Sequence, residues 1–393
     1  MNNPFTLGAG EGVIILYNRK IIELAAMIGA SCALGIAFSI SLVSKKIKFN
    51  FKDILNSSDN LIKTMPMFIW FIWFLIGIIF FIGITPAGGS FYASTYTSKL
   101  GGFLDFTPAA FLISYIIIIF VILDSFLDQS SLQRRIKKIF CLLIFLSFLF
   151  NLSTGTRELL PLIFGLIIFF YFLNNYNTKN KGNMIYPNKK IVISIFIFIL
   201  FILGQLIGYV RSELVGGNFE DLIENVNRYF GVEYMLLGTW SSALATVLSV
   251  AHDYTDNILK FSGGRDYYNL FISIPPGFIG DYFGYERPIN EYAGPAYQMR
   301  YGVGGTHITV LPFKNFGIFG VFFISATLFS MFLYVEKICF RRYTVVNSAI
   351  IVTIITIAPL FLWYGEKFAI NTFIILIILS FFYRICLSPQ KKS

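Results

Sequence analysis

Long runs of apolar residues set the first limit on what this chain can fold into. Several runs reach about 18 to 23 residues, and a helix of that length crosses the ~30 Å hydrocarbon layer of a bilayer. Charged residues make up 13% of the chain, whereas a soluble domain carries roughly 25%. The sequence therefore predicts an all-α, polytopic membrane helix bundle, and it excludes soluble, disordered and β-barrel proteins.

Nine apolar runs are predicted to be membrane spans. They cover residues 21–43, 65–86, 106–123, 139–152, 159–173, 191–210, 316–335, 344–363 and 369–386. The fourth and fifth runs are short, and they also fit one broken hairpin that does not reach full depth. We interpret them as two spans because the polar segment between them, 153–158, forbids a continuous helix through lipid.

Basic residues define the predicted orientation of these spans. They cluster in five alternate connections, at 45–63, 134–138, 179–190, 337–342 and 384–392. The positive-inside rule places those connections in the cytoplasm, the N-terminus outside and the C-terminus inside. The net charge of +10 is thus a topology signal, and we expect no nucleic-acid partner.

Three regions follow from this map. Residues 1–210 contain spans one to six, 211–315 form a long external loop, and 316–393 contain spans seven to nine and the cytoplasmic C-terminus. A connection of this length is normally functional, so the substrate-binding region is expected in the loop. Helical spacing predicts an amphipathic helix over 219–236. Residues 235–250 are predicted to form a nearly charge-free helix that re-enters the bilayer or lies against it, and 262–315 a structured loop rich in Gly, Pro and Tyr.

The first candidate site residue is Arg157, at the predicted external start of the fifth span. Its guanidinium, the hydroxyls of Thr154 and Thr156 and the N–H groups of a helix start could grip a pyrophosphate at headgroup level. The alternative is an ion pair with Glu158 or a contact with lipid phosphate.

Arginine is preferred over lysine in the external loop, which favours planar anion or sugar contacts. The candidates are Arg211, Arg265, Arg287 and Arg300. Arg265 follows two glycines that allow close approach to a ligand, although an ion pair with Asp266 is an equal alternative. Arg211 also fits a solvated residue at a helix end.

Aromatic and histidine side chains complete the candidate site. Tyr267 and Tyr301 offer apolar faces with hydroxyl edges that suit sugar rings, but tyrosine is also common at membrane interfaces. His307 has an ordinary pKa near 6.5 and is the candidate general base, with a structural loop histidine as the alternative. If histidine takes no part, the loop carboxylates Glu291, Asp281 and Glu286 are the next candidates.

No pattern for metal or nucleotide chemistry occurs in the chain. The four cysteines and two histidines lack metal-site spacing, and there is neither a phosphate-binding Gly-rich loop with its lysine nor an Asp-x-Asp pair. We therefore expect no metal and no cofactor, and a substrate already activated by lipid.

Together these features resemble the Wzy type of O-antigen or capsule repeat-unit polymerase. The resemblance rests on Thr154 to Arg157 at an external span start, on the large Arg- and Tyr-rich loop, and on the Gly-Gly-Thr-His stretch that leads into Asn315 to Gly320. The Gly-x-x-Gly entry with its histidine is also similar to O-antigen ligases. The Arg repeat of some Wzy proteins is not reproduced, because Pro276 lies eleven residues after Arg265.

The resemblance implies a metal-independent glycosyltransferase of the membrane-embedded GT-C type in the bacterial plasma membrane. It would polymerise undecaprenyl-pyrophosphate-linked oligosaccharides of a lipopolysaccharide or capsule pathway on the outer face. Its partners would be those lipids, the membrane and a chain-length regulator protein, with His307 as the base and Arg157 and Arg265 binding phosphate. An O-antigen ligase-like transferase and a polysaccharide flippase or transporter are the alternatives.

The predicted orientation can be checked by cysteine labelling. Single cysteines at Asn218 and Ser262 should react with an impermeant maleimide in spheroplasts, and one at Asn180 should not, because only the first two lie outside. Labelling at position 180 with protection of positions 218 and 262 would reverse the predicted orientation.

Overall fold

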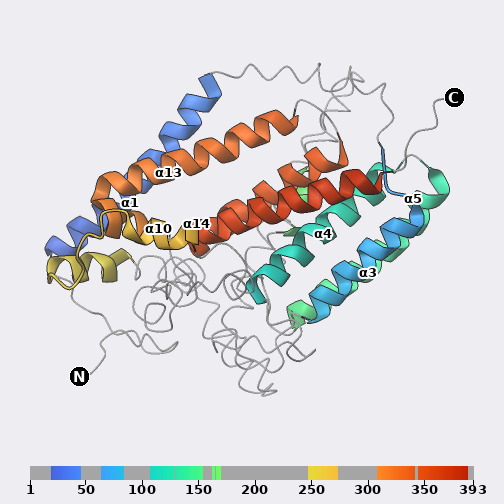
Figure 1. The fold of residues 1–393 in the computed structure, drawn as a ribbon, viewed down its shortest axis with the longest axis horizontal. Helices are drawn as coiled ribbons and strands as arrows, with labels where there is room; N and C mark the ends of the chain where they lie inside the picture. Colours follow the sequence, from blue (N-terminus) through green and yellow to red (C-terminus); the bar gives the residue numbers. More distant parts are fainter. Residues whose placement is uncertain are drawn as a thin grey trace, which may run out of the picture. The chain divides into compact units, whose positions relative to one another are not determined.

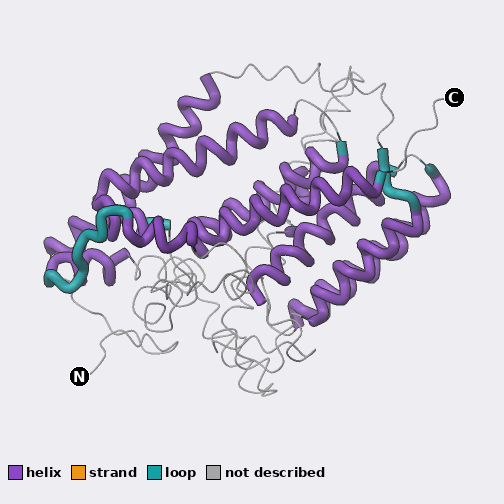
Figure 2. Tube along the Cα trace, in the orientation of Figure 1, coloured by secondary structure: helices purple, strands orange, loops and turns teal. Residues whose placement is uncertain are grey.

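The structure is a computed structural model that describes part of the chain. The described residues are 19–45, 63–83, 107–128, 130–153, 162–163, 165–169, 247–272, 308–340 and 344–387. Every regular element in these ranges is a helix (Figures 1 and 2). The all-helical prediction is confirmed for this part of the chain.

Three helical stretches are long and apolar enough to cross a membrane: Arg19–Val43, Val310–Cys339 and Phe368–Cys386. Shorter apolar helical stretches cover Met67–Ile79, Leu112–Leu127 and Val345–Ile357. These helices support the assignment of the chain to a membrane. The number of nine spans, the large external loop and the orientation of the termini stay predictions.

The main helices are labelled in Figure 1. They are α1 (Arg19–Lys45), α3 (Met67–Gly83), α4 (Thr107–Leu127), α5 (Ser131–Ser153), α10 (Arg265–Ile272), α13 (Val310–Phe340) and α14 (Val345–Cys386). The chain divides into two compact units. Unit one contains Met1–Lys48, Thr239–Tyr334 and Leu360–Ile370, and unit two contains Phe49–Gly238, Val335–Pro359 and Asn371–Ser393. The long helix α14 therefore contributes to both.

In unit one, α1 packs against α13 through a seam of small residues. The buried positions of α1 repeat at alternating spacings of four and three, the pattern of a coiled-coil seam: Ile21, Ala25, Ile28, Cys32, Gly35 and Ser39. A Cβ atom on Gly35 would lie 2.6 Å from the carbonyl oxygen of Phe322, so only glycine allows this approach. Small residues at helix contacts are typical of membrane proteins, where close backbone packing replaces the hydrophobic effect.

Hydrogen bonds along this seam show that α1 and α13 run in the same direction. Ser31 Oγ donates to the carbonyl of Ile318 at 2.8 Å, and Ser39 Oγ donates to that of Ala326 at 2.6 Å. Both pairs are 287 positions apart in sequence, so residues 31–39 of α1 lie alongside residues 318–326 of α13 in parallel. The predicted topology also requires its first and seventh spans to cross the membrane in the same direction.

A kink divides α13 near its start. Gly317 has φ 66° and ψ −155°, a conformation that essentially only glycine adopts. At Gly320 a Cβ atom would lie 2.5 Å from the carbonyl oxygen of Pro312, so a side chain there would collide with the turn before the kink. The two glycines therefore permit a sharp change of direction between Val310–Phe316 and the remainder of α13.

Unit two is built around α4. Nearly every side chain from Leu112 to Leu123 is buried, as expected of a helix that is apolar on all sides. α3 packs against both α4 and α5. Trp70 of α3 stacks on Phe74 and donates its indole N–H to the carbonyl of Val121 at 3.1 Å.

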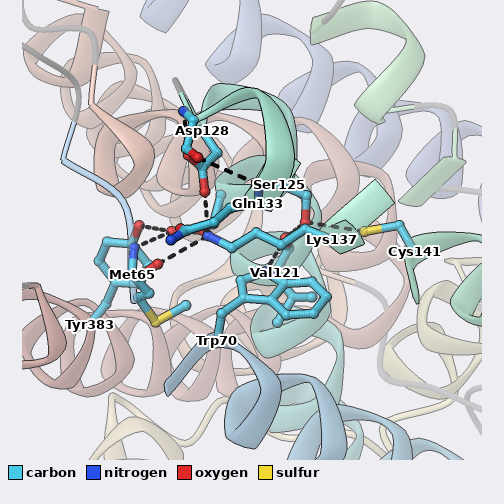
Figure 3. A network of polar contacts seen from close by, with 11 residues as sticks. Met65, Trp70, Val121, Ser125, Asp128, Gln133, Lys137, Cys141 and Tyr383 are labelled. Carbon is cyan, nitrogen blue, oxygen red and sulfur yellow. Dashed lines mark hydrogen bonds and ion pairs between the residues drawn. The ribbon is translucent and has the colours of Figure 1, made fainter. Parts of the chain in front are cut away.

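A fully buried lysine links the segments of unit two (Figure 3). Lys137 Nζ lies 2.6 Å from Asp124 Oδ1, 2.6 Å from Asp128 Oδ2 and 3.0 Å from the carbonyl oxygen of Met65. Its three N–H groups thus all have acceptors. Asp124 Oδ2 also accepts from Tyr383 Oη of α14 at 2.5 Å and from the N–H of Met65 at 2.8 Å.

Several predicted boundaries differ from the structure. α5 begins at Ser131, so the basic group at 134–138 occupies its first turns instead of a connection, and Lys137 points inward because two aspartates receive it. The predicted loop 262–315 contains α10 and the first turns of α13. Helical structure also continues through residues 364–368, the predicted gap before the ninth span.

The tight approach at Gly35 makes a direct test of the α1 seam possible. Gly35→Leu should lower the free energy of unfolding by about 1–3 kcal/mol, because a side chain forced into a packed contact must push the helices apart. Gly29→Leu is the matched control, since a Cβ atom at Gly29 has no neighbour within 4 Å. Denaturant titration of the purified variants in mixed micelles measures the free energy of unfolding of each. Equal losses in the two variants would show that α1 and α13 do not pack closely at Gly35.

Candidate functional site

The candidate site lies where the start of α10 packs on the start of α13 and on the middle of α14, all within unit one. We call it the α10 site and define it by Ser262, Arg265, Asp266, Tyr267, Asn315 and Glu366. Gly263 and Gly264 form the turn before α10, with φ 58° and 93°. The positive φ values explain the glycine pair, which the sequence suggested was a flexible approach to a ligand.

Asn315 holds the start of α10 in place. Its Oδ1 accepts from the N–H of Gly264 at 2.9 Å and lies 3.3 Å from that of Asp266, so it caps the free donors of the helix start. Its Nδ2 donates to Asp266 Oδ2 at 3.2 Å and to the carbonyl of Leu311 at 2.9 Å. One buried amide thus fixes two helices relative to each other.

Asp266 is buried and serves this local structure. Ser262 Oγ lies within hydrogen-bonding distance of both Asp266 Oδ2 and Asn315 Oδ1. Lys314 Nζ lies 3.6 Å from Asp266 Oδ2 and offsets its charge. Asp266 therefore belongs to the support of α10 and is not the ion-pair partner of Arg265 that the sequence allowed.

Arg265 occupies the first position of α10 with its side chain exposed. No residue in the described ranges forms an ion pair with it. Its guanidinium is therefore free of a described carboxylate partner, which fits the phosphate-binding role predicted for Arg265.

Tyr267 connects α10 to a buried carboxyl group on α14. Its hydroxyl donates to Glu366 Oε1 at 3.1 Å, and its ring stacks on Phe316 with centroids 5.9 Å apart and an interplanar angle of 12°. Glu366 is 4% exposed, whereas Tyr267 is partly exposed. The phenol therefore lies between the carboxyl group and the surface.

The surroundings of Glu366 change its acidity. Glu366 lies between the two apolar stretches of α14, Val345–Ile357 and Phe368–Cys386, and so outside both. Burial raises the pKa of its carboxyl group to about 7, while hydrogen bonds from its own backbone and from Tyr267 act in the opposite direction. Burial, together with the negative charges of Glu366 and Asp266, raises the pKa of Tyr267 above its ordinary value, which keeps the phenol a hydrogen-bond donor.

Of the predicted site residues, the structure brings Arg265 and Tyr267 together on α10. His307, Arg157, Thr154, Thr156, Arg211, Arg287, Arg300 and Tyr301 lie outside the described residues. No group of three or more His, Cys, Asp or Glu side chains that could hold a metal lies in the described part of the chain.

Glu366 is the functional candidate that sequence reasoning missed. Its position in the sequence could have identified it, because it is an acidic residue in the short gap between the two C-terminal apolar runs, on the predicted external side. Glutamate is rarely buried without a partner, so an acid in such a gap is itself a reason to look for a site.

Comparison with protein-family profiles, with curated proteins and with solved structures finds no match to this chain.

The role of Asn315 gives a stability prediction. Asn315→Ala should cost about 1–3 kcal/mol, because it removes the acceptor of the N–H groups at the start of α10 and one of the donors to the Asp266 carboxylate. Thermal unfolding of the purified protein in detergent should show a lower melting temperature. Asn269→Ala on the same helix is the control, and an equal shift in both variants would contradict the capping role.

Proposed function

We propose that this chain is a membrane-embedded glycosyltransferase that joins undecaprenyl-pyrophosphate-linked oligosaccharides into a surface polysaccharide on the outer face of a bacterial plasma membrane. The observation that carries the proposal is the α10 site, where an exposed arginine and a tyrosine bonded to a buried carboxyl group share one short helix. The resemblance of the sequence to Wzy-type polymerases supports the same reaction.

The chemistry of the reaction matches these groups. Transfer of a glycan from a lipid pyrophosphate needs a cation to offset charge on the departing pyrophosphate and a group to take the proton of the acceptor hydroxyl. Arg265 is suited to the first role because a guanidinium binds phosphate oxygens in pairs. The lipid tail of such a substrate stays in the bilayer, beside the exposed apolar faces of α1 and α13.

A second candidate function is transport of the lipid-linked glycan. The buried Glu366 between two apolar stretches favours it, because ionisable groups within membrane proteins often carry protons in transporters. The two functions differ in what accumulates when the protein is lost. A transporter mutant retains lipid-linked glycan on the cytoplasmic face, and a polymerase mutant displays single repeat units at the surface.

Deletion of the gene from its host tests the proposal. We expect surface polysaccharide to collapse from a ladder to single repeat units on a gel. Loss of all attached polymer with free polymer still present would indicate a ligase instead, and cytoplasmic accumulation would indicate a transporter. An unchanged ladder would exclude all three.

Complementation of the deletion then tests Arg265. Arg265→Ala should abolish the ladder, and Arg265→Lys should restore it only in part, because an ammonium group cannot bind phosphate oxygens bidentately. Lys260→Ala, at an exposed basic residue of the same segment, should behave as the wild type. Full ladders from Arg265→Ala would remove this residue from the site.

A further inference from the structure

We infer that Glu366, acting through Tyr267, receives the proton that the acceptor sugar hydroxyl loses during glycosyl transfer. This inference rests on the proposed function. It assigns the role of base to Glu366, which lies outside the predicted external loop, instead of to His307 within that loop.

The geometry makes Tyr267 the necessary intermediary. Glu366 is buried, so a sugar hydroxyl cannot reach it directly, whereas Tyr267, whose hydroxyl donates to it at 3.1 Å, is a partly exposed residue. The stacked ring of Phe316 fixes the plane of Tyr267, and Asn315 fixes the helix that carries it. The proton path from the surface to the carboxyl group is therefore one residue long and rigidly held.

The charges around Glu366 leave its proton exchangeable. Among the described residues, Tyr267 of α10 donates a hydrogen bond to Glu366 and Cys32 of α1 lies close enough to feel its charge, and neither group is basic. Lys314 of α13, a cation of the same site, lies 3.6 Å from Asp266 Oδ2. No ion pair to Glu366 forms within the part of the chain that the structure describes, and its pKa of about 7 lets the carboxyl group accept and release a proton in each cycle.

The reaction can be written so that every atom balances. The acceptor oxygen forms a bond to the anomeric carbon of the donor sugar as the bond from that carbon to the pyrophosphate oxygen breaks. The lipid pyrophosphate leaves with the bonding electron pair. The acceptor proton passes to Tyr267 Oη, while the phenol proton moves to Glu366 Oε1. Return of that proton to water through Tyr267 restores the starting state.

The test measures rate against pH with the purified full-length enzyme. Its substrate is lipid-linked oligosaccharide extracted from the deletion strain. We expect the wild-type rate to fall on the acid side with a midpoint near pH 7, because only the ionised carboxylate accepts the proton. Glu366→Gln should lower the rate by about 10² to 10⁴ and remove this acid limb, while Glu366→Asp should keep the limb.

Variants of two neighbouring tyrosines separate chemistry from folding. Tyr267→Phe removes the phenol oxygen and should slow the reaction strongly, whereas Tyr268→Phe, at a side chain that is 67% exposed, should match the wild type. Melting temperatures of all variants show whether each is folded. If a folded Glu366→Gln enzyme is slow but retains the acid limb, another group is the titrating base, and that result would overturn the inference.

Two further outcomes are decisive. Wild-type rate and pH profile in Glu366→Gln, or loss of the acid limb in His307→Gln alone, would place the base elsewhere. If the wild-type enzyme forms no polymer from the extracted lipid, the proposed function fails first and this inference fails with it. If the wild type forms polymer and the Glu366 and Tyr267 variants have no effect, the inference fails but the proposed function stands.

Discussion

A charge or polar group buried away from water needs its hydrogen-bond partners within the protein, and this constraint explains the buried polar contacts of both units. Lys137 shows it most fully, because its three donors have acceptors in two aspartates at the end of α4 and in the carbonyl of Met65 before α3. Removal of one partner from such a buried group is typically costly, about 3–5 kcal/mol. The same need explains why Asn315, whose amide satisfies both donors and acceptors, lies at the centre of the α10 site.

Three consecutive residues at the start of α13 each do a separate task for the candidate site. Asn315 caps α10, Phe316 stacks on Tyr267, and Gly317 provides the kink that lets both side chains face the same helix. These residues begin the Asn315 to Gly320 stretch that carries part of the resemblance to polymerases. The stretch therefore has a structural role, since it holds α10 and the ring of Tyr267 in place.

The helices were predictable because apolar runs report directly on lipid-exposed and buried faces. The predicted runs at 21–43 and 65–86 became α1 and α3 with small changes at their ends. The start of α13 was not predictable, because Lys314 and Asn315 read as loop residues until their partners across the fold are known. Arg265 and Tyr267 were predicted by their chemistry, whereas Glu366 was missed because its partner lies 99 positions away in sequence.

The parallel contact of α1 with α13 limits how the rest of the chain can be threaded through the membrane. Each crossing reverses the direction of the chain, so two spanning helices that point the same way must be separated by an odd number of crossings. The five predicted spans between α1 and α13 satisfy this condition. Three crossings also satisfy it, and that is the number if 139–152 and 159–173 form a hairpin that returns to the same side of the membrane. Counting that pair as a single span gives four crossings, which the shared 287-residue offset of the Ser31 and Ser39 hydrogen bonds forbids.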